Sequence, residues 1–338
     1  MYVPPDKLSW LRMLFKYRGT ALRRTKGRIA FTTGIACVIT YFDLHYGFFH
    51  QDLTPLPFTL VGLALGIFLG FRNNTSYDRF WEGRKLWGSM VNTARTLTRQ
   101  ILTLVGPQPE LARLTEGTHS PYRGALPTAE ERATDPELDE QLEFHREMVH
   151  RVAAYVHSVR KHLRSEDDLE DLRRLISNQE ADRLLNEPNR PYAILQKMGE
   201  RFRDAWLRGW VHAQHLPVLE QSLTSLTDIQ GGCERIKSTP IPFSYTALIH
   251  RIVAIYCVAL PFGITNQIGA LTPVVVAIIS YAFFGLDAVG DEIEDPFGTD
   301  DNDLPLTAIS TMIEINIRTR IGDKDLPEPI KPKEGVLV

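Results

Sequence analysis

One run of 35 residues, 252–286, carries no formally charged side chain. A helix needs about 20 apolar residues to cross the hydrocarbon core of a bilayer, so this run is almost long enough for two crossings. Pro261 lies near its middle and is followed by glycines and small polar residues, which is typical of a turn. We therefore predict two membrane helices, residues 246–260 and 271–286, joined by a short re-entry loop.

The N-terminal part contains a second pair of apolar runs. Residues 53–71 form a run of 19 uncharged residues, and residues 29–42 form a run of 14 that would also suit the core helix of a soluble protein. The six basic side chains nearest before the shorter run are Lys16, Arg18, Arg23, Arg24, Lys26 and Arg28. The connector 43–52 contains no lysine or arginine, so the positive-inside rule favours two crossings with the N-terminus in the cytoplasm. Four crossings place the C-terminus there as well, and the first run is an uncleaved anchor rather than a signal peptide.

The average composition hides these runs. The chain has 338 residues, of which 43% are hydrophobic and 23% charged, as in many soluble domains. The cause is residues 72–237, which are polar and have the spacing of amphipathic helices. We predict that residues 72–104 continue the second membrane helix, that further helices follow at 140–164, 166–176, 189–209, 216–236 and 305–321, that 106–139 is a surface loop and that 327–338 is a tail.

Several classes of function lack support. The formal net charge of −3 argues against a nucleic-acid partner, and three isolated cysteines argue against a disulfide framework or a cysteine-rich metal site. No nucleophile, nucleotide-binding or zinc-protease motif is present, so we expect no enzyme. Four histidines, His145, His150, His157 and His162, have spacings of 5, 7 and 5, which do not place three of them on one helix face within reach of one metal ion, and we interpret their helix as solvated. We interpret His212 and His215 in the same way.

The second apolar run combines two stripes at a four-residue step. Gly62, Gly66 and Gly70 form a G-x-x-x-G-x-x-x-G pattern, which lets helices approach closely in lipid. One position along, Leu63, Ile67 and Phe71 form a stripe of large apolar side chains. This stripe either packs against lipid and neighbouring helices, or faces a symmetry axis as a hydrophobic constriction.

An acidic segment follows the last apolar run. Eight carboxylates lie within residues 287–303, a density that suits a hard cation such as Ca²⁺. The alternative is a solvated acidic loop in which Asp303 caps the helix that begins near Pro305.

Three segments resemble the bestrophin family in its bacterial branch: residues 71–100, 231–246 and 291–306. The resemblance implies an all-α membrane protein with four transmembrane helices per chain, assembled as a homopentamer around a central pore. Residues 1–104 would hold the N-terminal flank, two spans and the emerging helix, and residues 105–236 a cytosolic helical domain. The last two spans would lie in residues 237–290, and residues 291–338 would hold the acidic segment, a helix and the tail.

The resemblance also implies roles for individual residues. It places a narrow neck at Leu63, Ile67 and Phe71, where leucine departs from the usual isoleucine or phenylalanine. It places a lower aperture at Val218, or at Pro217 or Leu219 if the register shifts. Animal relatives bind Ca²⁺ through positions that match Glu292, Asp295, Asp300 and Asp303, but bacterial relatives are not generally gated by Ca²⁺. We therefore expect no required cofactor, with Ca²⁺ as an optional ligand.

The function expected from these features is passive conduction of small monovalent ions across the bacterial cytoplasmic membrane. A hydrophobic neck does not select the sign of an ion, so selectivity arises from charges elsewhere. The acidic segment gives a slight preference for the cation interpretation, and chloride stays open. The alternative is a membrane-anchored helical scaffold or sensor without conduction. The expected partners are further copies of the chain, lipid and the permeant ions.

Overall fold

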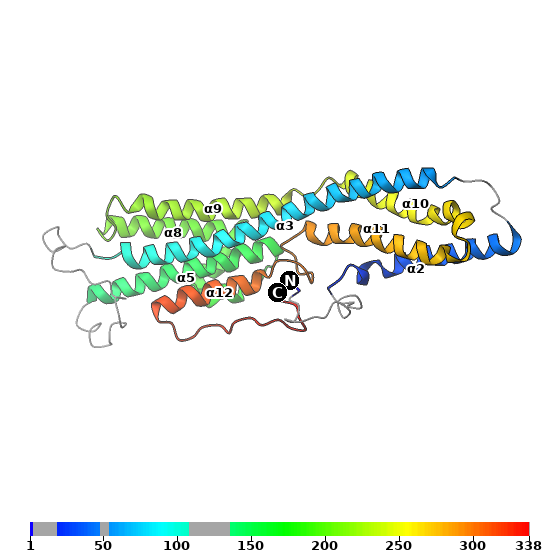
Figure 1. Ribbon diagram of the computed structural model, residues 1–338. Coiled ribbons are helices and arrows are strands. Elements are labelled where there is room, and N and C mark those ends of the chain that lie inside the picture. Colours follow the sequence, from blue (N-terminus) through cyan, green and yellow to red (C-terminus); the bar gives the residue numbers. More distant parts are fainter. Residues whose placement is uncertain (3–18, 48–53, 108–135, 338) are drawn as a thin grey trace. The chain divides into compact units, whose positions relative to one another are not determined.

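The computed structural model describes residues 1–2, 19–47, 54–107 and 136–337. Within these ranges the regular secondary structure is helical, with isolated β-bridges such as that between Val105 and Val211 and no β-strand (Figure 1). The all-α fold class is confirmed to this extent. The chain divides into two compact units. Unit 1 consists of Met1–Glu82, Ser238–Pro296 and Asp300–Asp303, and unit 2 consists of Gly83–Lys237, Phe297–Thr299 and Leu304–Val338.

Unit 1 is built from α2 (Leu22–Tyr46), the first part of α3 (Leu56–Leu104), α10 (Phe243–Ile268), η2 (Gly269–Leu271) and α11 (Thr272–Glu294). These helices share one apolar core, to which α3 contributes Leu65 and Leu69, α10 contributes Val253, and α11 contributes Val276 and Phe284. A hydrogen bond from Thr32 Oγ1 to Ser280 Oγ, 3.0 Å long, adds a polar contact between α2 and α11.

Two helical segments in the described part of the chain are long and apolar enough to cross a bilayer. They are Leu56–Leu104 and Phe243–Glu294, and the second contains both α10 and α11. The helix α2, which contains the predicted first span, does not meet the same criterion. The prediction that residues 72–104 continue the second span as one helix is confirmed, since α3 runs through 49 residues without a break.

The predicted turn at Pro261 is wrong in position. The helix α10 continues through Pro261 to Ile268, and Thr265 Oγ1 donates a hydrogen bond to the Pro261 carbonyl at 2.5 Å. A proline inside a membrane helix is tolerated where side chains and neighbouring helices satisfy the backbone. The chain turns instead at Gly269, whose φ of +58° favours glycine, and continues through η2 into α11.

Unit 2 contains the rest of α3 and the helices α5 (Pro136–Arg164), α6 (Glu170–Arg173), α7 (Asn178–Leu184), α8 (Arg190–Leu207), α9 (Leu216–Ser238), α12 (Leu306–Arg318) and η3 (Thr319–Ile321). The helix α5 packs against α8 and α12 and is buried on all sides from Arg151 to Lys161. It is the central element of this unit.

Most predicted helices of unit 2 are confirmed, with shifted ends. The helix α5 begins at Pro136, four residues before its predicted start, and residues 108–135 of the predicted loop lie outside the described part. The predicted helix 166–176 is wrong: only Glu170–Arg173 is α-helical there, and α7 follows unpredicted. Ser177 starts α7 because its side chain accepts a hydrogen bond from the Glu180 amide.

Candidate functional site

The first part of α3 has two faces of opposite character. Its buried face is formed by four residues, each at most 2% exposed: Leu65, Leu69, Arg72 and Ser76. The predicted neck residues Leu63, Ile67 and Phe71 are 65%, 52% and 59% exposed. Since successive residues of a helix are about 100° apart, this stripe points roughly away from the buried face. The stripe is therefore open to contacts outside its own chain.

The three glycines beside the stripe differ in their surroundings. A Cβ at Gly62 would lie 2.6 Å from the hydroxyl oxygen of Tyr256, so this glycine lets α10 approach α3. A Cβ at Gly66 or Gly70 would have no atom within 4 Å. Only Gly62 of the predicted ridge packs a helix within the chain, and Gly66 and Gly70 are exposed on the surface of α3.

The predicted aperture lies in the first turn of α9. Val218 is 43% exposed there, and Pro217 is also exposed. Leu219 is fully buried in unit 2, and a side chain buried in its own subunit cannot line an opening. Of the three registers considered, Val218 and Pro217 agree with the burial pattern.

The acidic segment is bound to the N-terminal part of α2. Arg24 lies 2.7 Å from a carboxylate oxygen of Asp300, and Arg23 lies 3.7 Å from one of Asp301. Glu292 accepts a hydrogen bond from the Asn302 side chain at 2.9 Å. The segment is therefore folded onto basic and amide donors, while Asp295 and Asp300 stay exposed, so it is solvated in part.

Asp303 does not cap α12. The N-cap of that helix is Pro305, without a side-chain hydrogen bond, and Asp303 Oδ2 instead accepts a bond of 2.7 Å from the Asp300 amide. Burial, together with the charges of Asp300 and Asp295, raises the pKa of Asp303 to about 7.

The four predicted Ca²⁺ ligands do not converge. Glu292, Asp300 and Asp303 each hold the donors just described, whereas Ca²⁺ requires six or more oxygen atoms around one point. Within the described ranges, the one group of three metal-ligating side chains whose atoms lie within 4.8 Å of one another is His250, Asp287 and Asp291. The residues present do not fit Ca²⁺, and we assign no step to it.

The guanidinium of Arg72 is bound within the group of His250, Asp287 and Asp291. Arg72 of α3 donates from Nη1 to Asp287 Oδ1 at 2.8 Å and pairs through Nη2 with Asp291. On α10, His250 Nδ1 lies 2.6 Å from Asp287 Oδ2, and its Nε2 lies 3.5 Å from Asp291 Oδ1. Three helices of unit 1 thus meet in one polar cluster, which the sequence reasoning missed. Its signal was Arg72, the first charge after 19 uncharged residues.

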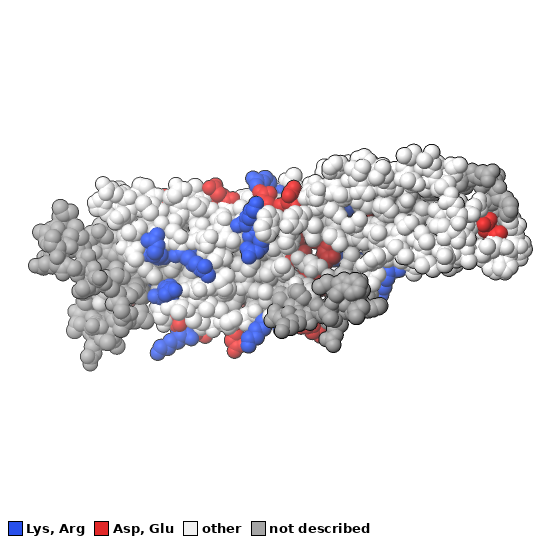
Figure 2. Space-filling model, viewed as in Figure 1, with Lys and Arg blue, Asp and Glu red and all other residues white. Residues whose placement is uncertain are grey.

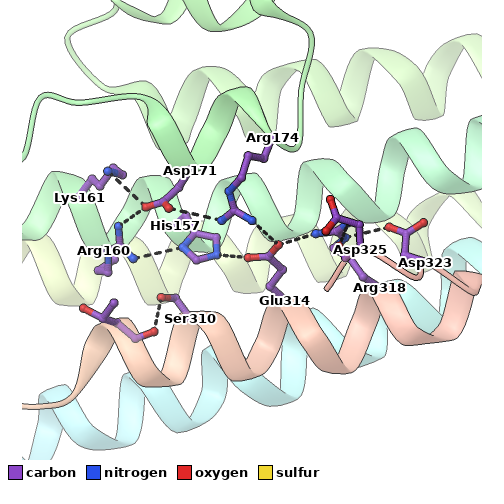
Figure 3. Close-up of polar contacts among 11 residues, drawn as sticks. His157, Arg160, Lys161, Asp171, Arg174, Ser310, Glu314, Arg318, Asp323 and Asp325 are labelled. Atoms are coloured by element: carbon purple, nitrogen blue, oxygen red, sulfur yellow. Dashed lines mark hydrogen bonds and ion pairs between the residues drawn. The ribbon is translucent and has the colours of Figure 1, made fainter. Parts of the chain in front are cut away.

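Two of the four histidines of α5 are buried, so the prediction of a solvated helix is wrong for them, whereas His150 and His162 are partly exposed. His145 is fully buried, and its Nε2 lies 2.7 Å from the carbonyl oxygen of Val105. His157 is also buried, 2.8 Å from Glu314 Oε2 on α12. Figure 3 shows Glu314 between the side chains of His157, Arg174 and Arg318. The prediction that these histidines do not gather around one metal ion agrees with their separate partners.

Comparison with known proteins identifies the family. A sequence model described as "Bacterial/Fungal Bestrophin protein" matches residues 1–319. A protein of Ralstonia nicotianae is 38% identical over 337 residues, covering 100% of both chains, and one of Mesorhizobium japonicum is 36% identical, covering 96% of this chain and 94% of the relative. Both relatives are named voltage-dependent anion channel-forming proteins.

A solved structure agrees with this result. A crystal structure of a bacterial bestrophin homologue from Klebsiella pneumoniae superposes with a TM-score of 0.76 at 31% sequence identity, covering 89% of this chain and 100% of the homologue. The match therefore extends over both units described above. The chain belongs to the bacterial and fungal bestrophin family.

Proposed function

We propose that this protein is an ion channel that conducts small monovalent ions passively through a hydrophobic neck. The observation that carries the proposal is the stripe of Leu63, Ile67 and Phe71, three large apolar side chains that point away from the buried face of α3. An apolar ring of this kind gates ions through its width and its wetting. Its position within the apolar half of α3 suits a path across a bilayer.

The surface of unit 1 supports placement in a membrane. Large apolar side chains are exposed along all its helices, including Phe31 on α2, Leu60 on α3, Ile255 on α10 and Ile278 on α11. On the face drawn in Figure 2, charged side chains are almost absent over this part of the chain. An apolar surface of such extent requires lipid or another subunit as its partner. We propose four spans, α2, α3, α10 and α11, in the cytoplasmic membrane with both termini inside.

A single stripe cannot enclose a pore, so the proposal requires several copies around one axis. A homopentamer is what the family resemblance implies, and the open surface at Gly66 and Gly70 offers room for a neighbouring helix. The path would continue through a vestibule formed by unit 2, with Val218 at its narrow end. In this proposal the four segments keep the roles predicted for residues 1–104, 105–236, 237–290 and 291–338.

The sign of the permeant ion depends on charges outside the neck. The predicted preference for cations rests on the acidic segment, and Arg23 and Arg24 neutralise part of it. The names of both relatives describe them as anion channel-forming proteins. A reversal potential measured across a KCl gradient distinguishes the two, because its sign shows directly which ion carries the current.

Flux from liposomes tests the conduction itself. The Ile67→Ala variant should conduct faster than the wild type because the constriction widens, whereas Ile278→Ala, which shortens another exposed isoleucine on α11, should not. Equal flux in both variants would show that the pore face is assigned wrongly. A monomeric or dimeric mass in detergent would contradict the central pore and favour the scaffold alternative.

A further inference from the structure

Each of the four proposed spans has a charged residue directly beside its uncharged run. These residues are Arg28 on α2, Arg72 on α3, Arg251 on α10 and Asp287 on α11. Arg28 lies 3.6 Å from Asp287 Oδ2, and Arg72 donates to Asp287 Oδ1 at 2.8 Å. His250, the residue before Arg251, lies 2.6 Å from Asp287 Oδ2. The four boundaries therefore lie side by side, and in the proposed membrane placement this level is the cytoplasmic edge of the hydrocarbon core.

Arg251 is an exposed charge on the apolar outer face of α10. The helix turns Ile249 and Val253 into the core of unit 1, and at about 100° per residue Arg251 lies on the opposite side. Its neighbours one turn away on the outer face are Leu248 and Ile255, which are 53% and 68% exposed. None of the described residues forms a hydrogen bond or an ion pair with Arg251. A charge at the edge of a membrane span generally has a partner, so this guanidinium is available to one from outside.

Arg28 repeats this arrangement on α2, which packs against α10. Its side chain is 53% exposed despite the contact with Asp287, and Phe31, one turn further along α2, is 64% exposed. Both helices enter the proposed membrane with their N-terminal ends in the cytoplasm. Because helix side chains tilt towards the N-terminus, both arginines are directed towards the cytoplasmic headgroups, whereas Phe31 and Ile255 lie at the level of the acyl chains.

A second copy of the chain offers Arg251 no free carboxylate at this level. Copies around an axis across the membrane present the same level to one another, and in the described part of unit 1 the carboxylates there are Asp287 and Asp291. Both already bind Arg72. The exposed Asp78 lies six residues beyond Arg72 on α3, which places it about 9 Å further into the cytoplasm. Lipid phosphates, in contrast, lie directly at the edge of the hydrocarbon core.

We propose that Arg251 binds the phosphate of an anionic phospholipid in the cytoplasmic leaflet, with Arg28 adding positive charge and with Ile255 and Phe31 contacting the acyl chains. Arginine suits this ligand because its planar guanidinium donates in parallel to two phosphate oxygens. Two neighbouring guanidinium groups repel a headgroup that carries its own cation, so phosphatidylglycerol binds better than phosphatidylcholine. The site rests on the membrane placement proposed above and does not require conduction.

A comparison of two lipids tests the site. The protein in a neutral detergent is mixed with dioleoyl phosphatidylglycerol or dioleoyl phosphatidylcholine, and native mass spectrometry measures the bound lipid. The wild type should prefer phosphatidylglycerol, and Arg251→Gln should reduce this preference about fivefold, the contribution of one arginine near a membrane surface. Arg251→Lys retains the charge and should retain most of the preference. The matched control is Arg203→Gln, which removes an exposed arginine of α8 in unit 2 and should leave the preference unchanged.

The outcomes separate the lipid site from the channel. An unchanged preference in Arg251→Gln overturns the site, and so does an equal loss in Arg203→Gln, because the effect would then follow net charge alone. A smaller oligomer of Arg251→Gln in lipid-free detergent also overturns it, because Arg251 would then bind a second copy of the chain. Flux without a lipid preference contradicts the site alone, whereas a lipid preference without flux contradicts conduction alone.

Discussion

The two units distribute polar and apolar groups in opposite ways. Unit 1 exposes many large apolar side chains and encloses one cluster of charges, whereas unit 2 exposes few and carries charged side chains over its surface. In unit 2 the centre of the fold is itself polar, because α5 contributes His145, His157 and Arg160 to buried contacts. Contact with lipid favours an apolar surface such as that of unit 1, and contact with water favours a charged surface such as that of unit 2.

Both units join helices through a histidine and carboxylates, but with different exposure. Glu314 is completely buried between His157 and Arg318. Burial alone would raise the pKa of Glu314, but the hydrogen bonds from His157 and Arg318 hold it below its usual value. His250 in unit 1 is about one-third exposed. The comparison indicates a buried contact in unit 2 and a partly exposed one in unit 1.

The largest expected effect comes from breaking the buried network of unit 2. Glu314→Ala leaves His157, Arg174 and Arg318 without their shared partner, which typically costs about 3–5 kcal/mol. Thermal unfolding in detergent measures the loss. The matched control is Glu200→Ala, because Glu200 pairs with Lys197 at the surface, where such pairs contribute less than about 1 kcal/mol. Similar melting temperatures for the two variants would contradict a structural role for the network.

Acid should destabilise unit 2 through His145. Burial lowers the pKa of His145 to about 4, although its hydrogen bond to Val105 opposes the shift. Below about pH 6.5 the unfolded chain binds a proton that the folded chain excludes, so stability falls as the pH drops and the loss is complete near pH 4. The full loss is about 3 kcal/mol. Hydrogen exchange of the first turns of α5 measures it, and His145→Gln should remove most of the acid sensitivity.

The glycines of α3 separate contacts within a chain from contacts between chains. Gly62→Ala should lower the stability of the protomer by about 1–3 kcal/mol, because the new methyl group overlaps the hydroxyl of Tyr256. Gly66→Ala meets no atom of its own chain, so it should affect only the assembly. Size-exclusion chromatography and thermal unfolding distinguish the two effects. A protomer destabilised equally by both substitutions would be contrary to this assignment.

The pH dependence expected at Asp303 has a sign opposite to that of His145. The raised pKa, about 7, means that the folded chain holds the proton more tightly than the unfolded chain. The resulting stabilisation is complete below about pH 4 and is lost as the pH rises through about 7. Asp303→Asn should therefore stabilise unit 1 at about pH 8 and change little at about pH 4. Equal melting shifts at both pH values would show that this carboxyl titrates normally.

Local patterns predicted the features that depend on neighbours in sequence. The stripe of Leu63, Ile67 and Phe71 follows from a four-residue step, because such residues lie on one face of a helix. The same logic predicted the unbroken helix from the apolar run to Leu104. The prediction of a turn at Pro261 was wrong because a proline breaks an isolated helix more readily than one that packs against neighbouring helices.

The polar clusters depend on partners that are distant in sequence. His157 and Glu314 are 157 residues apart, and Arg72 and Asp287 are 215 residues apart, so no local window contains both members of either pair. The histidines of α5 were therefore judged by their own polarity, although buried carboxylates and carbonyl oxygens satisfy them. A lone acidic residue within the apolar pattern of α12 was the available signal for Glu314.

The distance in sequence between Arg72 and its carboxylates also affects how the protein is made. Ribosomes add about 5–20 residues per second, so Asp287 is synthesised on the order of ten to forty seconds after Arg72. During this interval the second apolar segment ends in a charge that has not yet met its acceptors. The cell must keep that end of the segment in water or at lipid headgroups until α11 has been synthesised. A chain truncated before α11 would leave Arg72 without its carboxylates, and this unpaired charge is a feature that cellular quality control can recognise.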